Sequence, residues 1–249
     1  MFTDTKAIVT GGASGIGLAA ARWLADRGAA VAILDRVQVD RAIGLDSYVV
    51  DLTDDPGVRD GVSAAISKLG GLDVLVNNAG IGAQGTIEDN DDDEWHRVFD
   101  VNVLGVVRVT RACLPVLRQS MKASVVNTCS VAATVGLPAR ALYSASKGAV
   151  ASLTLAMAAD YLREGIRVNC VSPGTADTPW IGRLLDNSSD PQAERAALEA
   201  RQPHGRLIAP SEIAAAIGYL AGSEAGSTTG TVLTVDGGLT TLRLRPANA

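Results

Sequence analysis

Aromatic side chains, cysteines and histidines are all scarce in this sequence. Phe, Trp and Tyr make up 4% of its 249 residues, whereas Gly accounts for 26 of them, so we expect close backbone packing and many turns in place of bulky stacked rings. Only two histidines and three cysteines are present, and no two cysteines have the Cys-x-x-Cys spacing of a zinc site. We therefore expect no metal site, and we expect the cysteines to be buried, reduced thiols.

Long apolar runs and basic blocks are missing as well. No uninterrupted apolar stretch approaches the roughly 20 residues that cross a bilayer, and the N-terminal MFTDTKAIVTGG lacks a cationic leader followed by an apolar stretch. We therefore expect a cytoplasmic protein with no membrane partner. The 22 Lys and Arg against 27 Asp and Glu leave a formal net charge of −5, which argues against nucleic acid as a partner.

What the sequence does contain is an alternation of two patterns. Continuous apolar runs predict seven buried strands, at 6–9, 31–35, 47–50, 73–76, 124–128, 166–171 and 231–235. Segments with helical periodicity lie between them, among them 15–27, 92–119, 141–163 and 211–220. This repetition predicts an α/β fold, in which residues 1–249 form one domain with a single doubly wound, parallel seven-stranded sheet and helices on both faces.

Two segments interrupt this regularity. Residues 36–46 join the second and third predicted strands and are too few for a full crossover helix, so we expect a loop or a truncated helix there. Residues 175–204 form a long polar insertion between two regular units. Because long insertions in compact α/β domains often cover a binding site, we expect 175–204 to be a substrate lid.

A glycine-rich loop, TGGASGIG at 10–17, follows the first predicted strand and opens the first predicted helix. Gly11, Gly15 and Gly17 carry no Cβ that would block the tight turn, the pyrophosphate or the contact between helix and strand. The helix N-terminus also offers free N–H groups and a positive dipole end to phosphates. This order of strand, loop and helix predicts the dinucleotide-binding site of a Rossmann fold.

The second predicted strand ends in Asp35. A carboxylate at this position accepts hydrogen bonds from the hydroxyls of the adenosine ribose and repels a 2′-phosphate, which favours NAD over NADP. The neighbouring Arg36 leaves NADP open as the alternative, because a guanidinium binds phosphate.

The clearest chemical pattern is Ser130 followed by Tyr143-Ser144-Ala145-Ser146-Lys147. Tyr143 and Lys147 share one face of a helix, where the ammonium favours the phenolate. A tyrosine in this environment can take a proton from an alcohol while hydride leaves the same carbon. Ser130, near the end of a strand, can donate a hydrogen bond to the reacting oxygen.

These patterns make the chain similar to the short-chain dehydrogenases/reductases from Thr10 to Gly238. The matching segments are TGGASGIG at 10–17, Asp51-Leu52, NNAG at 77–80, Asn102, Ser130, Tyr143 with Lys147, Pro173-Gly174 and DGG at 236–238. The resemblance implies that Tyr143 is the general acid/base, that Ser130 polarises the substrate oxygen, and that Lys147 also binds the nicotinamide ribose. Asn102 would hold a water that connects Lys147 to solvent.

The resemblance also implies which residues bind the cofactor. These are Gly11, Ser14, Gly15, Ile16, Gly17, Asp35, Asp51, Leu52, Asn78, Ala79, Gly80, Tyr143, Lys147, Pro173, Gly174, Thr175, Ala176 and Thr178. Helices of neighbouring subunits commonly pack together in this family, so we expect a homo-oligomer, with a tetramer favoured.

Three arginines indicate the class of substrate. Arg140 precedes Tyr143 by one helical turn, and Arg183 and Arg201 lie in or beside the predicted lid. A guanidinium binds a carboxylate through two parallel hydrogen bonds, so arginines that converge on the pocket, together with Ser130 and Tyr143, would select a small hydroxy acid. A surface role for Arg183 is equally open. The segments PGTADTP and ARQPHGR resemble the subgroup of cytosolic 3-hydroxybutyrate dehydrogenases and 2-keto-3-deoxy-sugar-acid dehydrogenases.

Two other functions remain as alternatives. A 3-oxoacyl-carrier-protein reductase normally uses NADP and offers a basic patch to its acidic carrier, and both Asp35 and the acidic balance oppose it. A non-catalytic NAD-sensing regulatory protein on the same fold would have little need for Asn102, Ser130, Tyr143 and Lys147 together.

Overall fold

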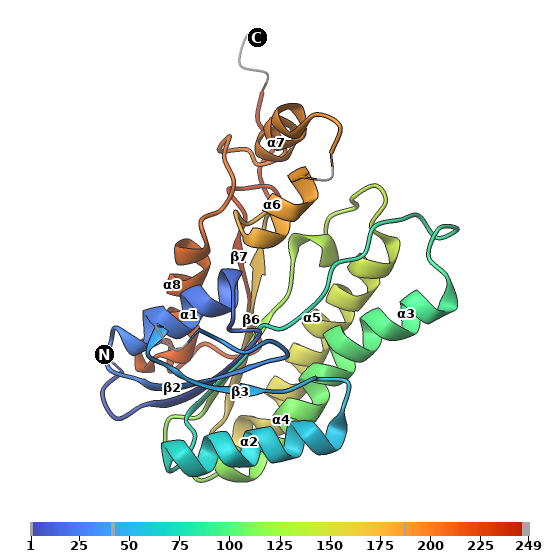
Figure 1. The fold of residues 1–249 in the computed structure, drawn as a ribbon. Helices are drawn as coiled ribbons and strands as arrows, with labels where there is room; N and C mark the ends of the chain where they lie inside the picture. Colours follow the sequence, from blue (N-terminus) through green and yellow to red (C-terminus); the bar gives the residue numbers. More distant parts are fainter. Residues whose placement is uncertain (1, 41–42, 187, 246–249) are drawn as a thin grey trace.

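Seven strands form one parallel sheet at the centre of the computed structural model, which describes residues 2–40, 43–186 and 188–245 (Figure 1). Their order across the sheet is β3-β2-β1-β4-β5-β6-β7. The chain therefore builds the sheet outward from β1 to β3, and then from β4 to β7 on the other side, which confirms the predicted doubly wound α/β fold. The strands are β1 Lys6–Thr10, β2 Ala30–Asp35, β3 Asp46–Val49, β4 Val74–Asn77, β5 Ser124–Thr128, β6 Arg167–Pro173 and β7 Val232–Val235.

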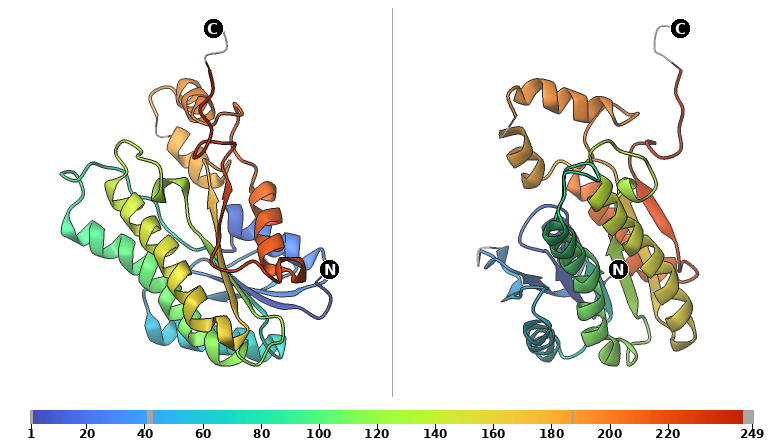
Figure 2. Two further views of the ribbon diagram at one scale, coloured as in Figure 1. Left: turned by 180° about the vertical axis from the view of Figure 1, so that it is seen from behind. Right: turned by 90° about the vertical axis from the view of Figure 1, so that its right-hand side faces the viewer.

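Helices cover both faces of this sheet (Figure 2). Successive strand residues point to opposite faces, so Val9 of β1 packs with α1 (Gly15–Ala25) and α8 (Pro210–Ala221), whereas Ile8 packs in the second core layer. That second layer contains residues of α2 (Asp55–Leu69), α4 (Gly105–Leu117) and α5 (Ala141–Tyr161). Both layers consist mainly of Ala, Val, Leu and Ile, in keeping with the scarcity of aromatic residues.

The carboxyl ends of the strands all lie at one edge of the sheet because the strands are parallel. The direction of winding reverses between β1 and β4, and a doubly wound sheet binds ligands in the crevice at such a reversal. The loops that follow β1, β4, β5 and β6 meet at this edge. They carry about half of the residues that the sequence singles out as functional, among them Gly11, Asn78, Ser130 and Gly174.

The predicted lid is a helical unit. It contains α6 (Pro179–Asp186) and α7 (Pro191–Ala200), which lie beyond the carboxyl end of β6 (Figure 1). Ile181, Leu198 and Leu207 form a small apolar cluster of their own within it. Its base is fixed by two backbone hydrogen bonds of 2.9 Å, from the Ile208 N–H to the Thr175 carbonyl and from the Asp177 N–H to the Ile208 carbonyl.

The helix predicted over 92–119 contains a turn that the sequence does not predict. α3 (Asp92–Phe99) and α4 are joined by a π-helical turn at Asp100–Leu104, and α4 ends at Leu117. Apolar periodicity predicts a helix but does not distinguish an α-helical turn from a single π-helical one. Such turns are rare and occur frequently at functional sites. Asn102, which is 1% exposed, lies at the centre of this one.

Three further features concern the β2–β3 connection, helix length and the cysteines. The described residues between β2 and β3, 36–40 and 43–45, contain no α-helix. Within the described ranges, no helix is both long enough and apolar enough to cross a membrane. Cys113, Cys129 and Cys170 are buried, free thiols.

Candidate active site

The loop between β1 and α1 requires glycine at several positions. Gly11 and Gly15 have φ angles of +66° and +56°, which favour glycine, and a Cβ on Gly17 would lie only 2.1 Å from the carbonyl oxygen of Gly11. Ser14 is the N-cap residue of α1, but its side chain forms no capping hydrogen bond. The first N–H groups of any α-helix have no acceptor within the helix, and here the N-cap side chain supplies none either. The N–H groups at the start of α1, such as that of Ile16, can therefore bind the pyrophosphate of a dinucleotide.

Asp35 lies beside this loop. Its Oδ2 accepts a hydrogen bond of 2.9 Å from the Ala13 N–H, and its Oδ1 accepts one of 3.1 Å from the Val37 N–H. These bonds hold the carboxylate at the end of β2, next to the turn that would carry the adenosine ribose. The structure therefore brings Asp35 together with the glycine-rich loop.

The loop after β4 is tied directly to the glycine-rich loop. The Thr10 hydroxyl accepts hydrogen bonds from the N–H groups of Asn78 and Ala79, at 3.0 and 3.1 Å. The Asn78 amide donates in return to the carbonyls of Thr10 and Gly11, both at 3.2 Å. Asn78, Ala79 and Gly80 are thereby placed along the crevice between β1 and β4.

Asp51 and Leu52, two further predicted cofactor residues, follow β3. Leu52 is buried against Gly105, and Asp51 is exposed. Hydrogen bonds from the Thr53 N–H and hydroxyl lower the pKa of the Asp51 carboxyl, and the nearby charge of Arg36 adds to this effect.

The start of the lid lies on the glycine-rich loop. A Cβ on Gly15 would contact Thr178 at 3.3 Å, so the segment Thr175–Thr178, with Ala176 within it, crosses from Gly174 at the end of β6 to the start of α1. The Gly174 N–H donates to the Val235 carbonyl at 3.0 Å. Pro173, the last residue of β6, and Gly174 are thus fixed beside Val235 of β7.

Tyr143 and Lys147 lie one turn apart on α5, as predicted. The Lys147 ammonium donates a hydrogen bond of 2.9 Å to the Thr128 carbonyl and lies 5.8 Å from the centroid of the Tyr143 ring. Lys147 is only 5% exposed, so its charge is held close to Tyr143. Ser130 follows β5 by two residues, and its hydroxyl accepts a hydrogen bond of 3.2 Å from the Ala132 N–H.

The π-helical turn brings Asn102 to the same place. Asn102 Oδ1 accepts a hydrogen bond from the Ile81 N–H at 2.8 Å, while its amide donates to the Ile81 carbonyl at 2.9 Å and to the Ser146 hydroxyl at 3.0 Å. A Cβ on Gly80 would lie 3.1 Å from Asn102 Oδ1 and 3.4 Å from Lys147 Nζ. The amide and the ammonium therefore border one point beside Gly80.

Arg140 lies at the start of α5 and is influenced by the charge of Arg201, which is distant in sequence. Arg140 donates a hydrogen bond of 3.0 Å to the Ala83 carbonyl. Burial lowers the pKa of Arg140, and the neighbouring positive charge of Arg201 lowers it further, whereas Tyr143 and Glu194 act in the opposite direction. Arg201 is exposed at the end of α7.

Arg183 is the third predicted arginine. It lies exposed on α6, one turn after Trp180. Its role in substrate binding therefore stays a prediction.

The chain is similar in sequence to proteins of known activity. A family model described as enoyl-(acyl carrier protein) reductase matches residues 11–240. The chain is 41% identical to cis-4-hydroxycyclohexanecarboxylate dehydrogenase of Sinomonas cyclohexanicum, over 96% of this chain and 98% of that protein. The chain belongs to the short-chain dehydrogenase/reductase family. It is also 38% identical to 2-(S)-hydroxypropyl-CoM dehydrogenase 3 of Xanthobacter autotrophicus, over 94% of this chain and 96% of the relative.

Solved structures of short-chain dehydrogenases/reductases contain either form of the nicotinamide cofactor. A 3-ketoacyl-(acyl-carrier-protein) reductase of Brucella melitensis complexed with NADH is 32% identical, with a TM-score of 0.87 over 96% of this chain and 100% of that chain. An actinorhodin polyketide ketoreductase with NADPH is 33% identical, with a TM-score of 0.91 over 97% and 100% of the two chains. This short-chain dehydrogenase/reductase is therefore an oxidoreductase that acts on CH–OH groups with a nicotinamide dinucleotide.

Two further residues at the site have no signal in the sequence. Gln202 is 1% exposed; its amide donates to the Thr175 hydroxyl at 3.1 Å, while its Oε1 has no hydrogen-bond partner in the described structure. Trp180 lies against Gly82 and Arg140. Both are contributed by the lid, and only its folded conformation places them beside the crevice.

Proposed function

We propose that the protein is an NAD-dependent dehydrogenase that oxidises the secondary alcohol of a small hydroxy carboxylate and reduces the corresponding ketone in reverse. The observation that carries this proposal is the position of Arg140, which is half-buried at the start of α5, one turn before Tyr143, and is held there by the Ala83 carbonyl. Neither Arg140 nor Arg201 forms an ion pair among the described residues. A guanidinium without an ion-pair partner favours an anionic ligand. A carboxylate fits best, because its two oxygens match the paired N–H groups of arginine.

The substrate class agrees with a relative. Cis-4-hydroxycyclohexanecarboxylate, named in the relative that is 41% identical, carries both a secondary hydroxyl and a carboxylate. A 3-hydroxy acid or a sugar acid also carries both groups. In each case the carboxylate would bind at Arg140 and Arg201 while the hydroxyl reaches Ser130 and Tyr143.

The residues around Tyr143 support proton transfer. The phenolic oxygen of Tyr143 would accept the proton of the substrate hydroxyl, the Ser130 hydroxyl would donate a hydrogen bond to the same oxygen, and the Lys147 ammonium would favour the phenolate. When bound, the nicotinamide supplies the hydride acceptor. Asn102 and Lys147, which border one point beside Gly80, would hold a water there and pass the proton onward to solvent.

The cofactor choice is supported by the charges near the ribose. Asp35 is anchored by two backbone N–H groups beside the glycine-rich loop, where its charge would repel a 2′-phosphate. Arg36, the residue that could counter this repulsion, lies near enough to Asp51 to influence its pKa. The anchored charge of Asp35 therefore favours NAD.

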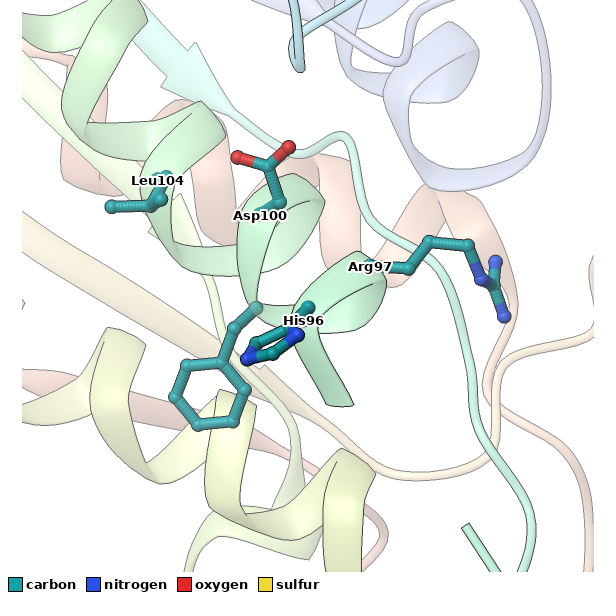
Figure 3. A pocket seen from close by; sticks show the side chains of 5 residues that line it. His96, Arg97, Asp100 and Leu104 are labelled. Atoms are coloured by element: carbon teal, nitrogen blue, oxygen red, sulfur yellow. The ribbon is translucent and has the colours of Figure 1, made fainter. Parts of the chain in front are cut away.

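We also propose that the chain forms a homo-oligomer, a tetramer by family resemblance, through the helices that include α3, α4 and α5. These helices run side by side in both views of Figure 2. Leu104, Leu155 and Leu162 are 47%, 52% and 57% exposed there. A surface hollow of about 340 Å³ on the same segment is lined by His96, Arg97, Phe99, Asp100 and Leu104 (Figure 3). A second copy would cover this apolar surface.

Replacement of the tyrosine tests the mechanism. Tyr143→Phe removes only the proton-accepting oxygen, so turnover should fall about 100- to 10,000-fold while the dissociation constant for NAD, measured by calorimetry, stays unchanged. Tyr161→Phe, which removes a hydroxyl from the far end of the same helix, should keep normal turnover. Near-normal turnover of Tyr143→Phe would rule out the proposed acid/base.

Replacement of the acidic residue tests cofactor choice. Asp35→Asn keeps an acceptor for the Ala13 N–H but removes the charge, so we expect the ratio of kcat/KM for NAD to that for NADP to fall at least about tenfold. Steady-state kinetics with both dinucleotides and one alcohol measures this ratio. A ratio equal to that of the unchanged protein would remove Asp35 from cofactor selection.

The arginine pair predicts a selective loss. Arg140→Met and Arg201→Met should each raise KM for a hydroxy carboxylate about tenfold or more, because a charge-assisted hydrogen bond is lost, and should spare the neutral alcohol of the same skeleton. Arg163→Met removes the same charge at the far end of α5 and serves as the control. Equal effects on acid and alcohol would mean that the arginines only support the fold.

Mass measurement by light scattering tests the assembly. The unchanged protein should have the mass of a tetramer, and Leu104→Glu together with Leu155→Glu should lower it, because burying these charges in an interface is costly. Met121→Glu, at a fully exposed residue, should leave the mass unchanged. A monomeric unchanged protein would contradict the proposal.

A further inference from the structure

Trp180 connects the lid to the loop that follows β4. It is the second residue of α6 and is 41% exposed despite its size. Its neighbour Ile181 is buried in the apolar cluster of the lid, but Trp180 is not a member of that cluster. The indole instead contacts Gly82, where an added Cβ would lie 3.0 Å from Cζ2 and 3.4 Å from Cε2. The side chain therefore points from the lid towards the crevice.

This contact explains why residue 82 is a glycine. Its φ lies outside the left-handed region, so the backbone itself does not require glycine. A side chain at this position would push the indole away, because 3.0 Å is closer than a Cβ normally approaches another carbon. Gly82 and Trp180 thus fit one another across the mouth of the site.

The same indole lies beside the arginine that we assign to the carboxylate. The Arg140 guanidinium carbon is 5.8 Å from the centroid of the Trp180 ring, within the range of a cation–π contact. Arg140 is held in place by the Ala83 carbonyl and by pairing with Gly85. It follows Ala139, whose φ of +52° is strained for a residue with a side chain. The position of Arg140 relative to the indole is therefore fixed by the backbone.

The surface between Tyr143 and Arg140 is largely apolar. The Tyr143 ring packs in a cluster with Ala83, Leu142 and Ile81. Trp180 faces this cluster from the lid through its contact with Gly82. A substrate that reaches from the Tyr143 hydroxyl to the Arg140 guanidinium would lay its carbon skeleton along this surface.

We propose that Trp180 determines which carbon skeleton the enzyme accepts. The indole forms an apolar wall that favours an unsubstituted hydrocarbon skeleton, above all an alicyclic ring, and disfavours a polyhydroxylated one. A hydrocarbon ring packs on the indole face, whereas additional hydroxyls would lose their hydrogen bonds to water without replacement. The inference rests on the proposed function for the carboxylate contact, and among its substrates it selects alicyclic hydroxy acids over sugar acids.

Kinetics with matched pairs of substrates tests the wall. The first pair is 4-hydroxycyclohexanecarboxylate and gluconate, and the second, without carboxylate, is cyclohexanol and inositol. We expect kcat/KM to favour the carbocycle in each pair, and Trp180→Gln to lower kcat/KM for the carbocycles about 10- to 100-fold, chiefly through KM. Trp180→Phe should retain most of the preference. Propan-2-ol, too small to reach the indole, should be oxidised equally well by all variants.

A double-mutant cycle separates the wall from general damage to the lid. Gly82→Ala should displace the indole and reduce the carbocycle preference as Trp180→Gln does, and the double variant should lose no more than either single one, because both act on one contact. Gly182→Ala, on the same helix, adds a methyl group that meets nothing within 4 Å and is the matched control. Calorimetric binding of cyclohexanecarboxylate to the NAD complex gives a second readout that needs no turnover.

The outcomes distinguish this inference from the proposed function. If Trp180→Gln or Gly82→Ala loses the preference for cyclohexanol over inositol, the role of Trp180 is supported. This holds even if the carboxylate substrates react no better than the neutral ones, because that result would contradict only the proposed binding of the carboxylate by the arginines. Equal losses for propan-2-ol and cyclohexanol, additive effects of the two substitutions, or an unchanged protein that prefers polyols would each overturn the role of Trp180. Failure of both pairs to give measurable binding or turnover would overturn it as well.

Discussion

The close crossing of the β1–α1 loop at Gly11 and Gly17 is the constraint on which the site depends. A Cβ at Gly17 would collide with the Gly11 carbonyl, so only glycine lets α1 start this near the edge of the sheet. That placement presents the first N–H groups of α1 to the crevice. It also leaves the Gly11 carbonyl within reach of the Asn78 amide, which ties the loop after β4 to the loop after β1. The loops after β1 and β4, the strands between which the direction of winding reverses, are thereby held in a fixed position relative to each other.

The catalytic side of the crevice depends on a local departure from regular structure. Asn102 lies in the π-helical turn, which has one residue more than an α-helical turn. From this position its side-chain amide bonds to both the N–H and the carbonyl of Ile81. Those bonds fix the loop that continues into Gly82 and Ala83, on which Arg140 and Trp180 rest. One widened turn therefore supports both the surroundings of Tyr143 and the loop beside Arg140 and Trp180.

The sequence predicts the sheet and most of this edge because their causes are local. Continuous apolar runs require strands covered on both faces, the spacing of Gly11, Gly15 and Gly17 requires a tight βα turn, and Tyr143 and Lys147 are one helical turn apart wherever the helix lies. The π-helical turn leaves no comparable trace, because apolar periodicity predicts a helix without distinguishing an α-helical turn from a single π-helical one. The contact of Trp180 with Gly82 is equally invisible, because it joins two segments whose separation is set by the folding of the lid and not by any spacing.

The lid explains how one fold can serve many alcohols. Its apolar cluster of Ile181, Leu198 and Leu207 gives α6 and α7 a core of their own, so residues on the opposite side, such as Trp180 and Arg201, can change without loss of that core. The groups that we propose for proton transfer come from α5, the π-helical turn and the loop after β5, and Tyr143 packs in the apolar cluster of Ala83, Val98 and Leu142. Chemistry and selectivity are thus supported by separate apolar cores. A change of substrate then requires changes in the lid and in the loop at Gly82, while the arrangement around Tyr143 remains intact.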